Sequence, residues 1–131
     1  MLKEGDIKSF LEEKSIAYNE KASIYGIIMG KGSYLIGVVD MDYYILHFND
    51  NGIAVIGVNA IGNLEKEVYE FIPFEEVRNI KFNKKIISYK LEIETDKGIC
   101  IFRVNNFMIG VPWHKENLIK IKNGLNMKKI E

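Results

Sequence analysis

Few residues in this chain are suited to acid–base catalysis, and their spacing forms no catalytic constellation. His47 is followed closely by Asp50. His114 is followed closely by Glu116. A histidine beside a carboxylate can exchange protons with a substrate, but no motif bearing a nucleophile accompanies either pair, and an isolated histidine on a strand or at a helix start usually has a structural role. The sequence therefore predicts that the protein is not an enzyme.

Calcium and phosphate sites are also disfavoured by their spacing. Asp40, Asp42 and Asp50, with neighbouring asparagines, offer oxygen ligands to Ca²⁺, but the chain lacks the loop spacing of an EF-hand. We predict that these residues form turns. The Gly-Lys-Gly-Ser run at 30–33 is part of a phosphate-loop pattern, but the full GxxxxGK(S/T) motif is missing. We interpret this run as a hairpin turn.

Thiol and zinc chemistry depend on Cys100, which is the only cysteine of the chain. The chain can therefore form no intrachain disulfide and lacks the ligands of a cysteine-based zinc site. Its two histidines are too few for a histidine-built metal site. Cys100 lies between Ile99 and Ile101, which predicts a small buried hydrophobic side chain. We expect no cofactor.

The composition predicts a soluble single domain at residues 1–131. Hydrophobic residues make up 47% of the chain and charged residues 27%, which is ordinary for a globular protein. The 18 basic residues balance the 18 acidic ones, so nucleic acid is not an expected partner. The N-terminus shows no signal-peptide pattern, and no apolar run approaches the roughly 20 residues that span a bilayer. We expect a cytoplasmic protein, and the abundance of Ile, Lys and Asn suggests a bacterial or phage source.

A helical extension is predicted at residues 1–18. Asp6 can cap the helix, and Ile7, Phe10 and Leu11 follow at the spacing of one apolar stripe. So short a helix is not stable alone, and its stripe must therefore dock on another surface. We expect it to pack on the domain's own sheet, and the surface of a partner is the alternative.

Residues 22–105 show strand patterns and predict a β-barrel. Glycines inside several strands favour the bends of a strongly coiled sheet. The clearest alternation places Ile87, Tyr89, Leu91 and Ile93 on one face, which predicts that all four are buried. The strands at 23–29 and 34–39 are expected to form the first hairpin. The predicted strands span residues 23–29, 34–39, 43–48, 53–58, 67–72, 77–82, 87–93 and 99–104.

A capping helix is predicted at residues 112–125. Pro112 suits the first turn of a helix, because its missing N–H would be unpaired there. Gly124 is expected to end the helix early and to leave 126–131 as a frayed tail. The strand at 99–104 is apolar on nearly all of both faces, so we expect the capping helix to cover its second face.

The order of seven or eight antiparallel strands and one amphipathic helix resembles the pleckstrin-homology-like (PH-like) superfold, in particular bacterial PH-like (GRAM-like) domains. The likeness rests on four runs: IPFEEV at 72–77, LEIETDKG at 91–98, FRV at 102–104 and WHKENL at 113–118. It implies a mainly β fold with α: a curved antiparallel sheet, or partly open barrel, capped by the C-terminal helix. It also implies a protein-binding or self-assembling module.

Two groups of residues are candidate binding sites. The connection at 105–111 carries Phe107, Met108 and Ile109 where polar residues are usual. These three side chains either fold under the helix as core or form an apolar knob for a partner. The second group is a cluster of lysines, which is either a basic strip or an ordinary solvated face: Lys81, Lys84, Lys85 and Lys90.

The leading hypothesis is a non-catalytic binding or assembly module that engages a protein partner or another copy of itself. Peripheral binding to an anionic lipid surface is the alternative, and a small enzyme with a pocket at the barrel end is the least favoured. Specific phosphoinositide binding is not expected. The first hairpin, at 25–39, contains only Lys31, whereas PH domains that bind phosphoinositides carry several basic residues there.

Overall fold

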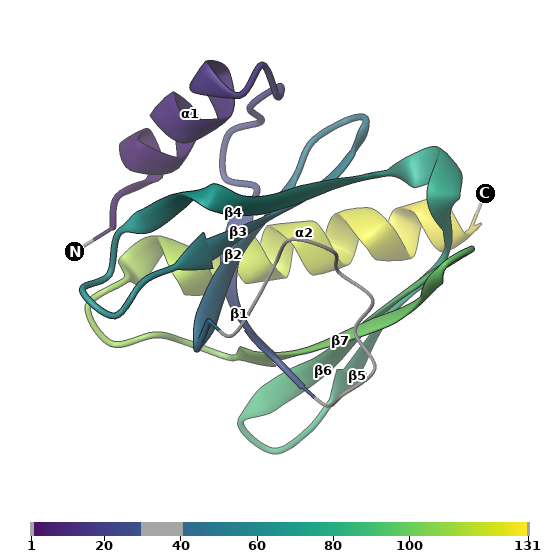
Figure 1. The fold of residues 1–131 in the computed structure, drawn as a ribbon. Helices are drawn as coiled ribbons and strands as arrows, with labels where there is room; N and C mark the ends of the chain where they lie inside the picture. Colours follow the sequence, from purple (N-terminus) through teal and green to yellow (C-terminus); the bar gives the residue numbers. More distant parts are fainter. Residues whose placement is uncertain (1, 30–40, 131) are drawn as a thin grey trace.

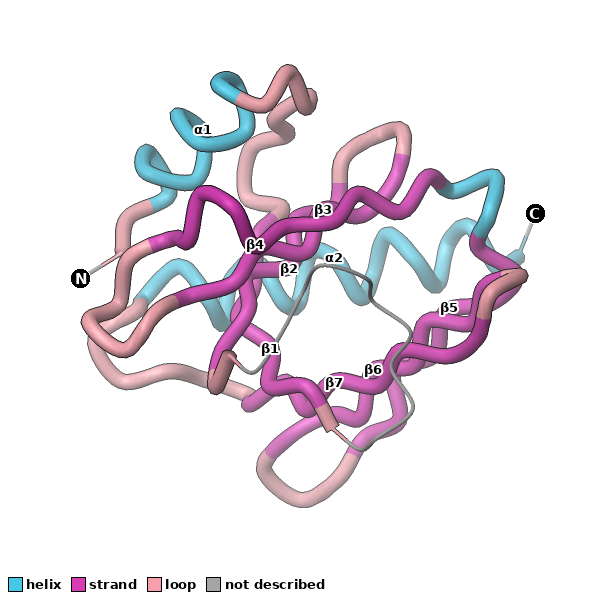
Figure 2. The backbone as a smooth tube through the Cα atoms, viewed as in Figure 1, coloured by secondary structure: helices cyan, strands magenta, loops and turns pink. Residues whose placement is uncertain are grey.

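The chain folds into one curved, open antiparallel sheet with two helices (Figures 1 and 2). The computed structural model describes residues 2–29 and 41–130. Within these residues, seven strands confirm the predicted fold class, a mainly β fold with a short N-terminal and a C-terminal helix. The elements are α1 (Glu4–Glu13), β1 (Ser23–Ile28), β2 (Tyr43–Phe48), β3 (Gly52–Val58), β4 (Leu64–Pro73), the 3-10 turn η1 (Phe74–Glu76), β5 (Val77–Lys84), β6 (Ser88–Thr95), β7 (Gly98–Asn105) and α2 (Pro112–Ile130).

Strand β1 joins the two halves of the sheet, whose order is β4-β3-β2-β1-β7-β6-β5. Residues 23–26 of β1 pair with β2, whereas Ile27 and Ile28 pair with Arg103 and Phe102 of β7. Strands β4 and β5 are the two edges of the sheet. The helix α2 runs between the two halves (Figure 1). The sheet is thus open, with the C-terminal helix in its concavity.

The described partners of β1 are β2 and β7. In the β1–β2 ladder, Ile24 lies opposite Leu46 and Tyr25 opposite Ile45. Ile24 and Leu46 are both fully buried in the main core. Pairing thus follows the strand that completes the core, which local β propensity does not reveal. The predicted strand at 34–39 and the predicted turn at 30–33 lie outside the described residues.

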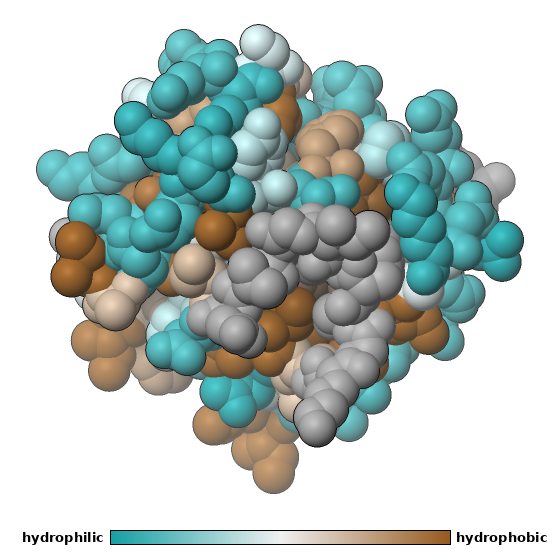
Figure 3. All heavy atoms as spheres, in the orientation of Figure 1, coloured by the Kyte–Doolittle hydropathy of each residue, from teal (hydrophilic) through white to brown (hydrophobic). Residues whose placement is uncertain are grey.

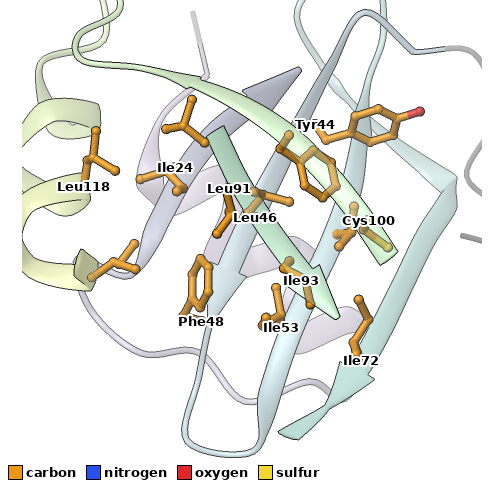
Figure 4. Close-up of a cluster of buried hydrophobic side chains, with 14 residues drawn as sticks. Ile24, Tyr44, Leu46, Phe48, Ile53, Ile72, Leu91, Ile93, Cys100 and Leu118 are labelled. Atoms are coloured by element: carbon orange, nitrogen blue, oxygen red, sulfur yellow. The ribbon is translucent and has the colours of Figure 1, made fainter. Parts of the chain in front are cut away.

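The main core fills the concave side of the sheet, beneath α2 (Figure 4). Alternate residues of β6 and β7 point into it, as the period of a half-buried strand requires. Leu118 and Ile121 of α2 close the core. Cys100 is buried there as a small hydrophobic side chain, as predicted. The side chains labelled in Figure 4 are Ile24, Tyr44, Leu46, Phe48, Ile53, Ile72, Leu91, Ile93, Cys100 and Leu118.

A second core lies on the convex side, between α1 and the β1–β4 half of the sheet. The predicted stripe of Ile7, Phe10 and Leu11 is buried in it, and the Phe10 ring meets the ring of Tyr69 edge-on at 5.7 Å. The helix therefore docks on its own sheet, as expected. Asp6 does not precede the helix but lies in its first turn, where its Oδ2 accepts the Lys3 N–H at 2.9 Å.

The predicted alternation along β6 fails at its first residue. Leu91 and Ile93 are fully buried and Tyr89 is half-buried, but Ile87 is 72% exposed. The reason is the turn before β6: the N–H of Lys85 donates to the carbonyl of Ser88 at 2.8 Å, so Ile87 lies in the turn and not in the ladder.

The capping helix also departs from its prediction in two ways. It continues through Gly124 to Ile130, since an interior glycine costs a helix only about 1 kcal/mol and the packing of Leu118 and Ile121 offsets this. It also packs on the main core through Leu118 and Ile121 and on the second core through Trp113, but not on the outer face of β7. The outer face of β7 therefore stays uncovered by the helix, and Ile99 is 44% exposed.

Candidate binding surface

His114, in the first turn of α2, fixes the connection between β7 and α2. Its Nδ1 accepts a hydrogen bond from the Tyr25 N–H at 3.1 Å, so the proton lies on Nε2, which donates to the Asn105 carbonyl at 2.7 Å. Burial lowers the pKa of His114, against the opposing effect of the bond to Asn105. Glu116 forms an ion pair with Lys21 instead, at 2.9 Å. His114 is thus a neutral structural anchor, and its candidate acid–base partner Glu116 is paired elsewhere.

The three apolar residues of this connection do not act together. Met108 packs against the second core, and its carbonyl accepts the Val111 N–H at 3.0 Å. Gly110, at a φ of +78°, lets the chain turn back between them. Phe107 is 59% exposed and Ile109 is 92% exposed. Met108 therefore folds under as core, while its two neighbours project outward.

The β5–β6 turn lies beside this connection. Its tip exposes Ile86 by 93% and Ile87 by 72%, and the Ile87 carbonyl accepts the Asn106 N–H at 3.1 Å, which ties the two loops together. Apolar atoms project at the bottom of Figure 3, where Figure 1 shows this turn. The four exposed apolar residues of the two loops are named here the two-loop surface: Ile86, Ile87, Phe107 and Ile109.

A hollow opens between the two loops. Its wall is formed by Ile87, Phe107, Ser88, Asn105 and the single charged residue Arg103. Such a lining can accept an apolar side chain beside one cation. Sequence reasoning missed the contribution of the β5–β6 turn, because the contact between residues 87 and 106 is long-range. The available signal was the Ile86-Ile87 pair directly after two lysines at a turn.

The four predicted basic-strip lysines are not brought onto one face. Lys81 lies opposite Glu92 in the β5–β6 ladder, and the Lys90 Nζ lies 3.3 Å from the Glu92 carboxylate on the same face. Lys84 points to the face of β5 opposite to that of Lys81, and Lys85 lies in the turn. The structure therefore places a carboxylate between Lys81 and Lys90 and leaves Lys84 and Lys85 near the two-loop surface.

His47 is a second structural histidine, with no exposed surface. Its Nε2 accepts the Asn19 N–H at 3.0 Å, so the proton lies on Nδ1, which donates to the Ser23 Oγ at 2.6 Å. The ring stacks on Tyr18 at 5.0 Å, and burial lowers its pKa to about 4. Asp50 accepts a hydrogen bond from the Asn19 side chain. The candidate His47–Asp50 acid–base pair is therefore not formed.

A hollow of about 170 Å³ lies at the end of the barrel near the β2–β3 turn. Phe48, Phe74 and Leu125 contribute apolar walls, and neither histidine lines it. The Lys120 ammonium at its rim donates to the Glu20 carbonyl at 2.8 Å. Across the residues that the structure describes, no group of three or more His, Cys, Asp or Glu is placed to hold a metal ion. Asp42 is exposed, and the predicted turn residue Asp40 lies outside the described ranges.

Comparison with known proteins returned no family model, no curated protein and no solved structure that matches this chain. Within the described part of the chain, none of the helices has the length and apolar character needed to cross a bilayer.

Proposed function

We propose that this protein is a non-catalytic, PH-like binding or assembly module. It engages a protein partner, or another copy of itself, through the two-loop surface, and acts in the cytoplasm. The observation that carries the proposal is the exposure of four large apolar side chains on two adjoining loops. Exposed apolar residues that gather in one place mark interaction sites, whereas scattered ones do not. The open sheet with a helix in its concavity supports the PH-like assignment.

The loops that carry this surface are held in place by the fold. His114 bonds the start of one loop, the Met108 carbonyl closes its end, and the Asn106 N–H joins it to the β5–β6 turn. A surface that is ordered before binding loses less conformational entropy when a partner docks. Because these hydrogen bonds hold the two loops in place, their exposed apolar side chains are better suited to binding a partner than those of a loose connection.

The non-catalytic part of the proposal rests on the two histidines. Each is neutral, buried and bonded through both ring nitrogens to groups of the fold. A general base must reach a substrate proton, and neither His47 nor His114 has a free nitrogen to do so. The hollow at the barrel end lacks both histidines.

The binding role is tested by the double variant Phe107→Ser with Ile109→Ser, which leaves Met108 in the second core. Ile61→Ser is a matched control, since Ile61 is 82% exposed on the β3–β4 loop. We expect partner capture from source-cell lysate to recover the same amount of bound protein with the wild type and the control, and clearly less with the double variant. Unchanged capture by the double variant would remove this surface as the binding site.

A second candidate function is docking on an anionic lipid surface. The segments 77–91 and 97–115, which include both loops of the two-loop surface, contain lysines and arginines but no Asp or Glu. Apolar loop tips beside cations suit an anionic interface, where each cation near the surface contributes about 1 kcal/mol. Cosedimentation with phosphatidylserine vesicles at low salt, lost on Lys84→Glu with Lys85→Glu, is the expected result. No binding of the wild type to these vesicles ends this candidate.

A further inference from the structure

Among the described strands, β4 and β5 form the two edges of the sheet, and these edges carry opposite charge. Strand β4 contains Glu65, Glu67 and Glu70 with one lysine, whereas β5 contains an arginine and two lysines with no carboxylate. Within the described ranges, the arginine of β5 pairs with Asp96, but no salt bridge involves Glu67 or Glu70 of β4, or either lysine of β5. Each edge therefore presents charged side chains that form no salt bridge within the described fold, although Lys81 lies opposite Glu92 of β6.

Both edges also present backbone groups that can extend the sheet. In an antiparallel ladder, every second residue turns its N–H and C=O away from the paired strand. The Lys85 N–H donates to the Ser88 carbonyl, so the backbone groups of Lys85 point toward β6. Because this direction alternates from residue to residue, the backbone groups of Ile80 and Phe82 point away from β6. No other described strand pairs with this edge.

The directions of the backbone groups of β4 follow from the same alternation. The Phe74 N–H donates to the Asn51 carbonyl at 2.9 Å, so the backbone groups of Phe74 point toward the β3 side. The backbone groups of Tyr69 and Phe71 therefore face away from β3. Among the described strands, β4 has no second neighbour. An unpaired edge is a template for another strand unless charge or cover prevents it.

We propose that β4 of one molecule pairs with β5 of the next, so that copies of this chain assemble head to tail. Charge decides between the ways in which two edges can meet. Pairing β5 with β5 brings lysines together, and pairing β4 with β4 brings glutamates together, so both symmetric contacts are repelled. The β4–β5 contact alone joins opposite charges. Contacts of this heterologous type build rings or open filaments.

The directions of the backbone groups allow any antiparallel register in which an outward-facing residue of β4 lies opposite one of β5. Charge complementarity selects among these registers, and the selected one places Phe71 of one copy opposite Ile80 of the next. The same register puts Glu70 directly opposite Lys81 and Tyr69 opposite Phe82. All four apolar and aromatic residues are half-buried within one copy, so the contact covers side chains that the single sheet leaves partly exposed: Tyr69, Phe71, Ile80 and Phe82.

This inference goes beyond the proposed function, because the edges do not include the two-loop surface. The substitutions Phe107→Ser and Ile109→Ser therefore leave head-to-tail assembly unchanged. Conversely, reversal of an edge charge leaves binding through the two-loop surface unchanged. Failure of one proposal can thus be told from failure of the other.

The test measures the mass of the purified full chain by light scattering over a concentration series at low salt. We expect the wild type to exceed the 15.1 kDa of one chain and to grow with concentration. Lys81→Glu and Glu70→Lys each turn an attraction into a repulsion, and each weakens association about tenfold. Lys115→Glu reverses an exposed cation on α2 and serves as a control without effect.

The decisive arm mixes the two weakened variants. Copies of the two variants can then alternate along the assembly. At every junction, position 81 of one variant faces position 70 of the other, and the two side chains carry opposite charges. We expect the mixture to recover the wild-type mass. The proposal is overturned if the wild type stays monomeric at millimolar concentration, if the single variants associate as the wild type does, or if the mixture does not recover.

Discussion

The two halves of the sheet differ in how many of their faces are covered. In the β1–β4 half, the main core lies on one face and α1 covers the other, and all of β3 is buried. In the β5–β7 half the described residues cover only the concave face, and β6 alternates between buried and half-buried residues. The two halves therefore differ because the 10-residue helix α1 covers the outer face of one half and leaves the outer face of the other exposed.

Both proposed interaction sites involve the half with one covered face. The β5–β6 turn supplies two residues of the two-loop surface, and the end of β7 leads into the loop that supplies the others. The basic edge β5 belongs to the same half.

The largest expected effect comes from removing the same aliphatic side chain in each half. Ile45 on β2 is fully buried beneath α1, whereas Ile99 on β7 is 44% exposed on the uncovered face. We expect Ile45→Ala to lower the free energy of unfolding by about 2–5 kcal/mol, and Ile99→Ala to lower it by about 1 kcal/mol or less. Chemical denaturation measures both. Equal losses would show that the two outer faces are not differently covered.

Acid should weaken the covered half through His47. Burial lowers its pKa from 6.5 to about 4, so in the unfolded chain it binds a proton at a higher pH than in the folded chain. Stability is therefore full above pH 6.5 and falls as the pH drops toward 4, by about 3 kcal/mol. Denaturation curves from pH 7 to pH 4 measure this loss.

The matched variant is His47→Gln, which does not titrate in this range. It is less stable than the wild type at pH 7, since bonds to Asn19 and Ser23 are weakened, but its stability changes less between pH 7 and pH 4. The account of His47 fails if the wild type and the variant show the same pH slope.

The covered half also depends on Asn117, which ties α2 to α1. Its Nδ2 donates to the Ser23 carbonyl at 2.9 Å and to the Glu4 carboxylate at 3.1 Å, and the residue is 1% exposed. We expect Asn117→Ala to cost about 1–3 kcal/mol and to speed hydrogen exchange in α1. Asn123→Ala, at an exposed position of α2, is the control. Unchanged exchange in α1 would argue against this tie.

The smallest effect is expected at the two-loop surface. Phe107→Ser with Ile109→Ser should change the free energy of unfolding by only about 0.5 kcal/mol, since both side chains already contact mainly solvent. Met108→Ser should cost more, because Met108 packs on the second core. Thermal denaturation separates these cases, and a large loss for the double variant would place the two residues in the core.

Much of this fold was predictable because its signals are local. The stripe of Ile7, Phe10 and Leu11 predicted a helix that docks on the sheet, and the alternation of Leu91 and Ile93 predicted buried positions in β6. These patterns repeat at the period of the element that they form. They identify faces from neighbouring residues alone.

The errors concern interactions between residues far apart in the sequence. The uncovered outer face at Ile99 and the exposure of Ile87 depend on which elements meet in space. The candidate site was found in part, because Phe107 and Ile109 are conspicuous in a loop. Its other half at the β5–β6 turn could not be found, since the bond from the Asn106 N–H to the Ile87 carbonyl has no sequence pattern.

Photo-crosslinking tests the proposed function most directly. A photoreactive phenylalanine analogue is placed at Phe107 in the two-loop surface, and in a second sample at Glu12, an exposed position of α1. Irradiation in source-cell lysate should give a discrete adduct, with a partner protein or a second copy, from position 107 and none from position 12. No adduct at 107, or the same adducts at both positions, would contradict the account.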